Sequence, residues 1–301
     1  MTWIAFSGAL ELGFIYGLVG LGVYLSFRVL DFPDLTVDGS FPLGGAVAAT
    51  LIVQGVSPLL ATAIALIAGC LAGLCTAWLS VQFKILNLLA SILTMIALYS
   101  INLRIMGQPN VSLLGEPTVL TPLAGMLQQL PKLVGLPLVL FGVAIATKFL
   151  LDLFLASDLG LAMRATGSTP TMAEAQGIST GGMILGGLAL SNGLVALAGA
   201  LFAQTNGFAD VSLGVGTIVL GLAAVIIGEA LVGAVTGGVP LTVPLRTLGV
   251  LVGAVVYRLA IALALNASWI GLQAQDLNLV TAVLVAIALI APQGRRWLRR
   301  S

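Results

Sequence analysis

The stretch PLLATAIALIAGCLAGLCTAWLSVQ, residues 58–82, decides the fold class of this chain. It carries no charged residue, and it exceeds the roughly 20 apolar residues that a helix needs to cross a bilayer. Similar runs recur along the sequence, and they are too long and unbroken for the strands of a membrane barrel. Helices are the other structure that satisfies the backbone in lipid. The sequence therefore predicts an all-α, polytopic transmembrane helix bundle.

Composition supports the same fold class over the whole chain. Of 301 residues, 59% are hydrophobic and 8% are charged, whereas about a quarter of an ordinary soluble domain is charged. The net charge is only +1, so nothing in the composition indicates the broad basic face of a nucleic-acid-binding protein. Cys70 and Cys75 lie in one apolar run, a pattern typical of core packing rather than of a disulfide or a metal site. We expect one transmembrane domain over residues 1–301.

Apolar runs and the polar breaks between them predict about nine spans. Their expected bounds are 3–27, 41–55, 58–82, 86–106, 133–154, 181–203, 214–237, 244–264 and 277–293. The basic residues Arg295, Arg296, Arg299 and Arg300 suggest a cytoplasmic C-terminus. Counting back from there places Arg28, Lys84, Arg164 and Arg246 at inner loops and only Arg104 and Lys132 at outer ones, as the positive-inside rule requires.

The second span is too short to cross a bilayer by itself. Its 15 residues reach roughly 22 Å as a helix, and it follows the polar segment DFPDLTVDGS at 31–40. We expect a broken or re-entrant piece that lines a translocation path; an ordinary inner loop with a tilted helix is the alternative. The candidate path residues are Asp34, Thr36, Asp38, Asn192 and Asn206. The two asparagines come from the sixth span and from just beyond its outer end.

Three charged residues fall inside predicted spans. Each of Glu11, Glu229 and Arg258 costs at least about 2.5 kcal/mol near the bilayer centre if it is unpaired. Glu11 and Arg258 lie at similar depth, so they form a candidate pair, either a gate or substrate contact or a structural ion pair. Glu229 lies near the inner end of its span, not far from Arg246.

The loop at 156–180 predicts a short helix between two spans. Thr169 and Pro170 are a favourable helix start, Thr171 and Glu174 match a capping box, and Gly177 is a natural stop. The expected product is about two turns of helix on the inner side. The segment at 107–131 has a comparable length and lies on the outer side, where it could meet a binding protein.

Four motifs carry a resemblance to a known family: GFIYGLVGLG at 13–22, FPDLTVDG at 32–39, LAMRATG at 161–167 and EAQGI at 174–178. Their order and spacing resemble the branched-chain amino acid type of ATP-binding-cassette (ABC) importer permease. Within that family the chain is most similar to the branch for tryptophan, tyrosine and related small solutes. The resemblance implies transport of a small solute, expected to be an amino acid, by alternating access in the inner membrane.

The resemblance also implies partners. They are two cytoplasmic ATPase subunits, a second permease subunit, by default another copy, and an extracytoplasmic substrate-binding protein. The short helix is then the coupling helix, and the residues expected to couple to the ATPase are Arg164, Ala165, Thr166, Gly167, Pro170, Met172, Glu174, Ala175 and Gly177. The chain has no phosphate-binding Gly-x-x-x-x-Gly-Lys motif. We therefore expect this chain to bind no cofactor, and we expect the partner ATPase to bind ATP and Mg.

Two other functions compete with the importer. An ion-coupled secondary transporter would use intramembrane acids, for which Glu11 and Glu229 qualify. An integral membrane enzyme has less support, because the chain has no His, no nucleophile motif and no carboxylates at a useful spacing.

Overall fold

Long helices dominate the computed structural model, which describes residues 3–119, 121, 132–235, 242–266 and 283. In those residues, seven helices are long and apolar enough to cross a membrane. The long helices are α1 (Trp3–Val23), α3 (Pro58–Phe83), α4 (Asn87–Met106), α6 (Lys132–Ala156), α9 (Thr180–Asn206), α10 (Thr217–Val235) and α11 (Val243–Asn266). The predicted all-α bundle is confirmed, whereas the C-terminal arginines and all of the expected span at 277–293 except residue 283 lie outside the described residues.

The predicted short second helix is also confirmed, although it begins earlier than expected. Helix α2 spans Val37–Val53, so it starts four residues before the predicted position 41. The polar residues Asp38 and Ser40 therefore belong to its first turns. Pro42 is the sixth residue of α2 and has no N–H to donate to the Asp38 carbonyl oxygen one turn earlier, yet the helix continues past it to Val53.

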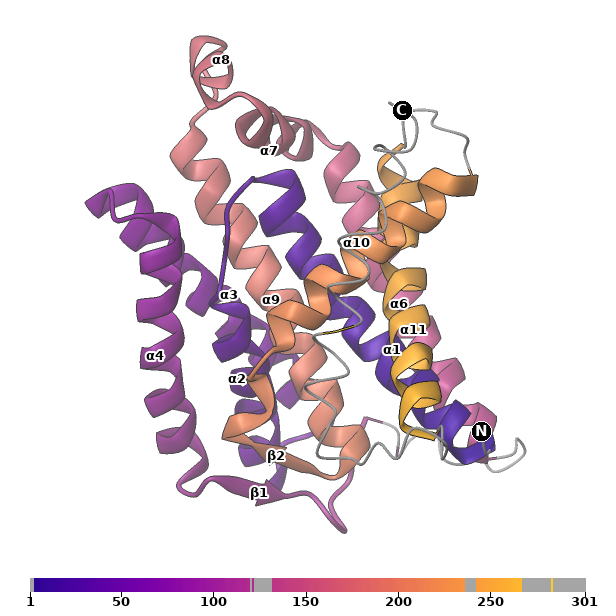
Figure 1. The fold of residues 1–301 in the computed structure, drawn as a ribbon. Coiled ribbons are helices and arrows are strands. Elements are labelled where there is room, and N and C mark those ends of the chain that lie inside the picture. The colour runs from indigo at the N-terminus through magenta and orange to yellow at the C-terminus, as the bar shows by residue number, and fades with distance from the viewer. Residues whose placement is uncertain (1–2, 120, 122–131, 236–241, 267–282, 284–301) are drawn as a thin grey trace.

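The chain turns back into the bundle before α2. Helix α1 ends in a π-helical turn, η1 (Tyr24–Val29), and residues 30–36 are not helical. Asp31 adopts a left-handed conformation, with φ of 52°, where the direction changes. Figure 1 shows this segment running from the end of α1 back into the middle of the bundle, where α2 begins.

Helix α2 packs against α9, its main partner in the core. A methyl group at Gly44 would come within 1.9 Å of the Ala196 carbonyl oxygen, so the two backbones touch directly. Nearby, the Tyr16 ring of α1 stacks on Phe41 of α2, and Phe202 of α9 meets Phe41 edge-on, so α1 joins the same contact. The short helix is thus enclosed by protein.

The two ends of the bundle differ. At one end lie α7 (Asp158–Ser168) and α8 (Pro170–Ala175), and at the other lies a two-stranded sheet of β1 (Asn110–Ser112) and β2 (Phe208–Asp210) (Figure 1). The strands are antiparallel, with Val111 opposite Ala209. A short 3-10 helix, η3 (Val211–Gly214), follows β2.

Asp210 fixes the turn from β2 into η3. Partial burial by itself raises the pKa of Asp210, but hydrogen bonds from the hydroxyl and N–H of Ser212 and from the Asn110 amide lower it below its ordinary value. The carboxylate therefore stays ionised and joins β1, β2 and η3 at this end of the bundle.

Candidate functional site

A buried polar network joins the non-helical segment to α9. The Asp34 carboxylate is fully buried and accepts the Thr36 N–H at 2.9 Å and the Asn192 side-chain amide at 2.7 Å. The Asn192 carbonyl oxygen in turn accepts the Ser40 hydroxyl at 2.7 Å. Thr36 also reaches α3, because its hydroxyl lies 2.7 Å from that of Thr76. Residues far apart in the sequence thus meet where the chain turns into α2.

Asp38 connects the start of α2 to the start of α10. Its two carboxylate oxygens accept the N–H groups of Gly216 at 3.2 Å and Ile218 at 2.7 Å. Those N–H groups lie at the N-terminus of α10, where a negative charge is favourable. Asp38 therefore couples the orientations of two helices.

Three of the five predicted path residues, Asp34, Thr36 and Asn192, join in one network, and Asp38 follows Thr36 by two residues but binds the start of α10. Asn206 does not join them, because it ends α9 near the sheet and donates to the Phe202 carbonyl oxygen. The sequence reasoning missed Ser40 and Thr76, both fully buried. Their small hydroxyls give little signal in an apolar run.

Beside Asp38 lies a hollow of about 440 Å³. Helices α2 and α4 and the turn around η3 line it, with polar groups from Asp38, Ser100, Asn102 and Ser212. A second hollow, of about 520 Å³ between α3, α6, α7 and α9, has Thr147 as the one polar side chain among its described lining residues. The hollow beside Asp38 is therefore the better candidate for binding a polar solute.

At the other end, α7 and α8 occupy the loop that was predicted to hold one short helix. Helix α8 lies at the expected position, and Gly177 ends it with φ of 81°. The predicted capping box is wrong, because the Glu174 carboxylate accepts the Thr180 hydroxyl at 2.7 Å instead. Helix α7 was not predicted, although Ser157, which caps it, and Asp158 in its first turn are start signals.

The predicted coupling residues divide into two groups. Thr166 is buried in α7, and Gly167 packs so closely on η1 that a methyl group there would come within 2.0 Å of the Val29 carbonyl oxygen. Ala165 is half-buried. The exposed members are Arg164, Pro170, Met172, Glu174, Ala175 and Gly177.

The intramembrane charges have other partners than expected. The predicted ion pair between Glu11 and Arg258 does not form: Glu11 accepts the Ser7 hydroxyl at 3.1 Å, and the Arg258 guanidinium lies 4.1 Å from the centre of the Tyr16 ring. Glu229 pairs with Arg28 of η1 rather than with Arg246. The aromatic face stabilises the cation in place of a carboxylate.

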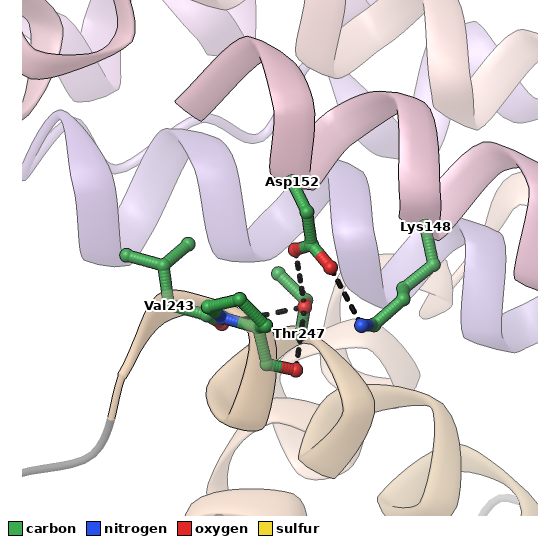
Figure 2. Close-up of polar contacts among 5 residues, drawn as sticks. Lys148, Asp152, Val243 and Thr247 are labelled. Carbon is green, nitrogen blue, oxygen red and sulfur yellow. Dashed lines mark hydrogen bonds and ion pairs between the residues drawn. The ribbon is translucent and has the colours of Figure 1, made fainter. Parts of the chain in front are cut away.

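A further charged pair was missed. Lys148 and Asp152 of α6 form an ion pair at 2.6 Å, and Asp152 also accepts the Thr247 hydroxyl of α11 at 2.6 Å, as Figure 2 shows. The four-residue spacing of opposite charges, which brings side chains together on one helix face, is the signal that could have found it. Within the described ranges, no group of three or more Cys, Asp or Glu side chains could hold a metal ion.

Comparisons with known proteins agree with this architecture. Residues 5–291 match the family described as "Branched-chain amino acid transport system / permease component". The chain is 40% identical over 277 residues to the "Tyrosine transport system permease protein" of Clostridioides difficile (strain R20291), covering 92% of this chain and 87% of that protein. It is also 40% identical over 206 residues to an uncharacterised protein of Rickettsia prowazekii (strain Madrid E), covering 68% of this chain and 70% of the relative. No solved structure matches. The chain is thus a multi-pass membrane protein that belongs to the branched-chain amino acid permease family, on its tyrosine-type branch.

Proposed function

We propose that the chain is the transmembrane permease subunit of an ABC importer that moves an amino acid, with tyrosine as the first candidate, by alternating access. Two cytoplasmic ATPase subunits bind ATP and Mg and drive it, and a second copy of the chain completes the pathway. The end with α7 and α8 faces the cytoplasm, together with the C-terminus, and the sheet end meets an extracytoplasmic binding protein. The chain itself forms one transmembrane domain, residues 1–301, in the inner membrane.

One contact supports the coupling role most directly. Gly167 of α7 packs on the Val29 backbone, only five residues before Asp34. Force applied to the exposed surface of α7 and α8 would therefore reach the segment that enters the bundle through a short, tightly packed connection. The Arg28–Glu229 ion pair joins the same turn to α10.

Copurification tests the ATPase interface. The wild-type chain should bring down a co-expressed partner ATPase, and Glu174→Ala or Arg164→Ala should reduce the amount retained about fivefold, the effect of roughly 1 kcal/mol at an interface. Glu116→Ala is the matched control, because this exposed carboxylate follows β1 at the opposite end. Equal losses in Glu174→Ala and Glu116→Ala would contradict the assignment of α8.

Uptake into proteoliposomes separates the importer from a secondary transporter. The assembled complex should accumulate L-tyrosine with ATP and the binding protein, and it should not respond to a proton or sodium gradient alone. Gradient-driven uptake without ATP would establish the alternative, for which the intramembrane acids Glu11 and Glu229 remain the candidates.

A further inference from the structure

Asn102 of α4 lines the hollow of about 440 Å³ and carries a buried polar atom without a partner among the described residues. Its side chain is fully buried, and its amide nitrogen donates to the Gly39 carbonyl oxygen at 3.2 Å. That bond fixes the orientation of the amide, so the other atom is the carbonyl oxygen Oδ1. Oδ1 has no hydrogen-bond partner in the described part of the chain. A buried acceptor left without a donor is costly, which indicates that a donor binds there in another state.

Asp38 presents a second acceptor to the same hollow. Its carboxylate receives two backbone N–H groups, whereas a carboxylate has about four acceptor sites, so capacity remains. The described lining includes no Lys or Arg, and neither ion pair among the described residues involves Asp38. The hollow therefore favours a positively charged donor.

The remaining walls are mainly apolar. Pro42 of α2, Met95 and Ile96 of α4, and Val211 and Val215 around η3 face the same space. The volume falls in the range of small-molecule sites, about 300–1,000 Å³. An apolar or aromatic side chain fits these walls, and a carboxylate has no basic partner among the described lining residues.

We propose that this hollow is the membrane-embedded binding site for the transported solute, and that it recognises an ammonium group on a small molecule with an apolar or aromatic side chain. Asn102 Oδ1 and the Asp38 carboxylate accept the ammonium N–H groups, and the apolar walls hold the side chain. This assignment rests on the proposed importer function and adds the residues that select the solute.

Thiol labelling tests the site without relying on transport. Cys70 and Cys75 are first replaced by Ala, and Ser100, an exposed residue that lines the hollow, is replaced by Cys in the full-length chain in membrane vesicles. L-tyrosine, L-leucine and their amines, tyramine and isoamylamine, should slow labelling by a small methanethiosulfonate at least about fivefold. The matching acids without an ammonium group, 3-(4-hydroxyphenyl)propionate and 4-methylvalerate, should not.

Two variants and a control assign the protection to the proposed acceptors. Asn102→Leu should raise the concentration of tyramine needed for protection about tenfold, as expected for the loss of a charge-assisted hydrogen bond. Asp38→Asn, which keeps one acceptor oxygen for α10, should do the same if Asn102→Leu does not fold. Thr94→Val, a buried α4 hydroxyl outside the hollow, should leave protection unchanged.

The outcomes separate this site from the importer function. Absence of labelling, equal protection by amines and acids, or full protection in both acceptor variants would overturn the site while ATP-driven uptake by the wild type stood. Ammonium-selective protection without any ATP-driven uptake would keep the site and overturn the importer.

Discussion

Helices α2 and α3 are neighbours in sequence and in space, yet they have different surroundings. Both are apolar, but 13 of the 17 residues of α2 are buried, whereas only 39% of the most apolar window of α3 is buried. Leu59, Ile67 and Leu71 of α3 are exposed over more than half of their surface, as expected for contact with lipid. Apolar character by itself therefore does not distinguish a helix that faces lipid from one that is enclosed by protein.

The largest expected effect comes from the backbone contact of α2. Gly44→Ala should destabilise the protein by about 3 kcal/mol or more, because its methyl group would meet the Ala196 carbonyl oxygen and force α2 away from α9. Thermal unfolding in mild detergent, followed by tryptophan fluorescence, measures it. Gly142→Ala on α6 is the control, since no atom lies within 4 Å of the added methyl group. If Gly44→Ala and Gly142→Ala unfolded at similar midpoint temperatures, the tight enclosure of α2 would not contribute more to stability than the packing of α6.

A smaller loss is expected from the polar network at the start of α2. Asp34→Ala leaves the Thr36 N–H and one donor of the Asn192 amide without their acceptor, so about 2 kcal/mol of stability should be lost. The same unfolding assay compares it with Asp158→Ala, an exposed acid in the first turn of α7. If both substitutions cost the same, the buried network contributes nothing specific.

The ion pair between η1 and α10 should contribute less. Arg28 is 51% exposed and Glu229 20%, so solvent screens their attraction and a coupling energy of about 0.5–1 kcal/mol is expected. A double-mutant cycle of Arg28→Gln and Glu229→Gln in the unfolding assay isolates it. Strict additivity of the two single changes would show that the pair does not couple α1 to α10.

The smallest effect is expected on the lipid face of α3. Leu71→Ala should change stability by less than about 0.5 kcal/mol, because lipid replaces the lost side-chain contacts. Leu188→Ala on α9, where the side chain is fully buried, should cost about 3 kcal/mol by comparison. A large effect at Leu71 would indicate that another protein surface, such as a second copy, covers this face.

The positions of the long helices could be predicted from the sequence, because the length of an apolar run is a local property. A run of about 20 apolar residues must form a helix in lipid, whatever its neighbours are, and the bounds of α3, α4 and α11 accordingly agree with expectation within a few residues. The short second helix followed from the same rule, since too few residues separate its polar ends to cross the bilayer.

Partners inside the bundle were not accessible in this way. Equal depth suggested that Glu11 would meet Arg258, but depth leaves the rotation of each helix about its axis open, and the structure turns Arg258 toward Tyr16. The polar character of 31–40 indicated a break, whereas only the packing of α2 against α9 decides that Asp34 meets Asn192, 158 positions away. The sequence by itself determined a membrane bundle with a broken second helix, because apolar length acts locally. The tertiary structure decided which polar groups share a site, because backbone contacts such as Gly44 on Ala196 set how the helices are rotated and how deep they lie.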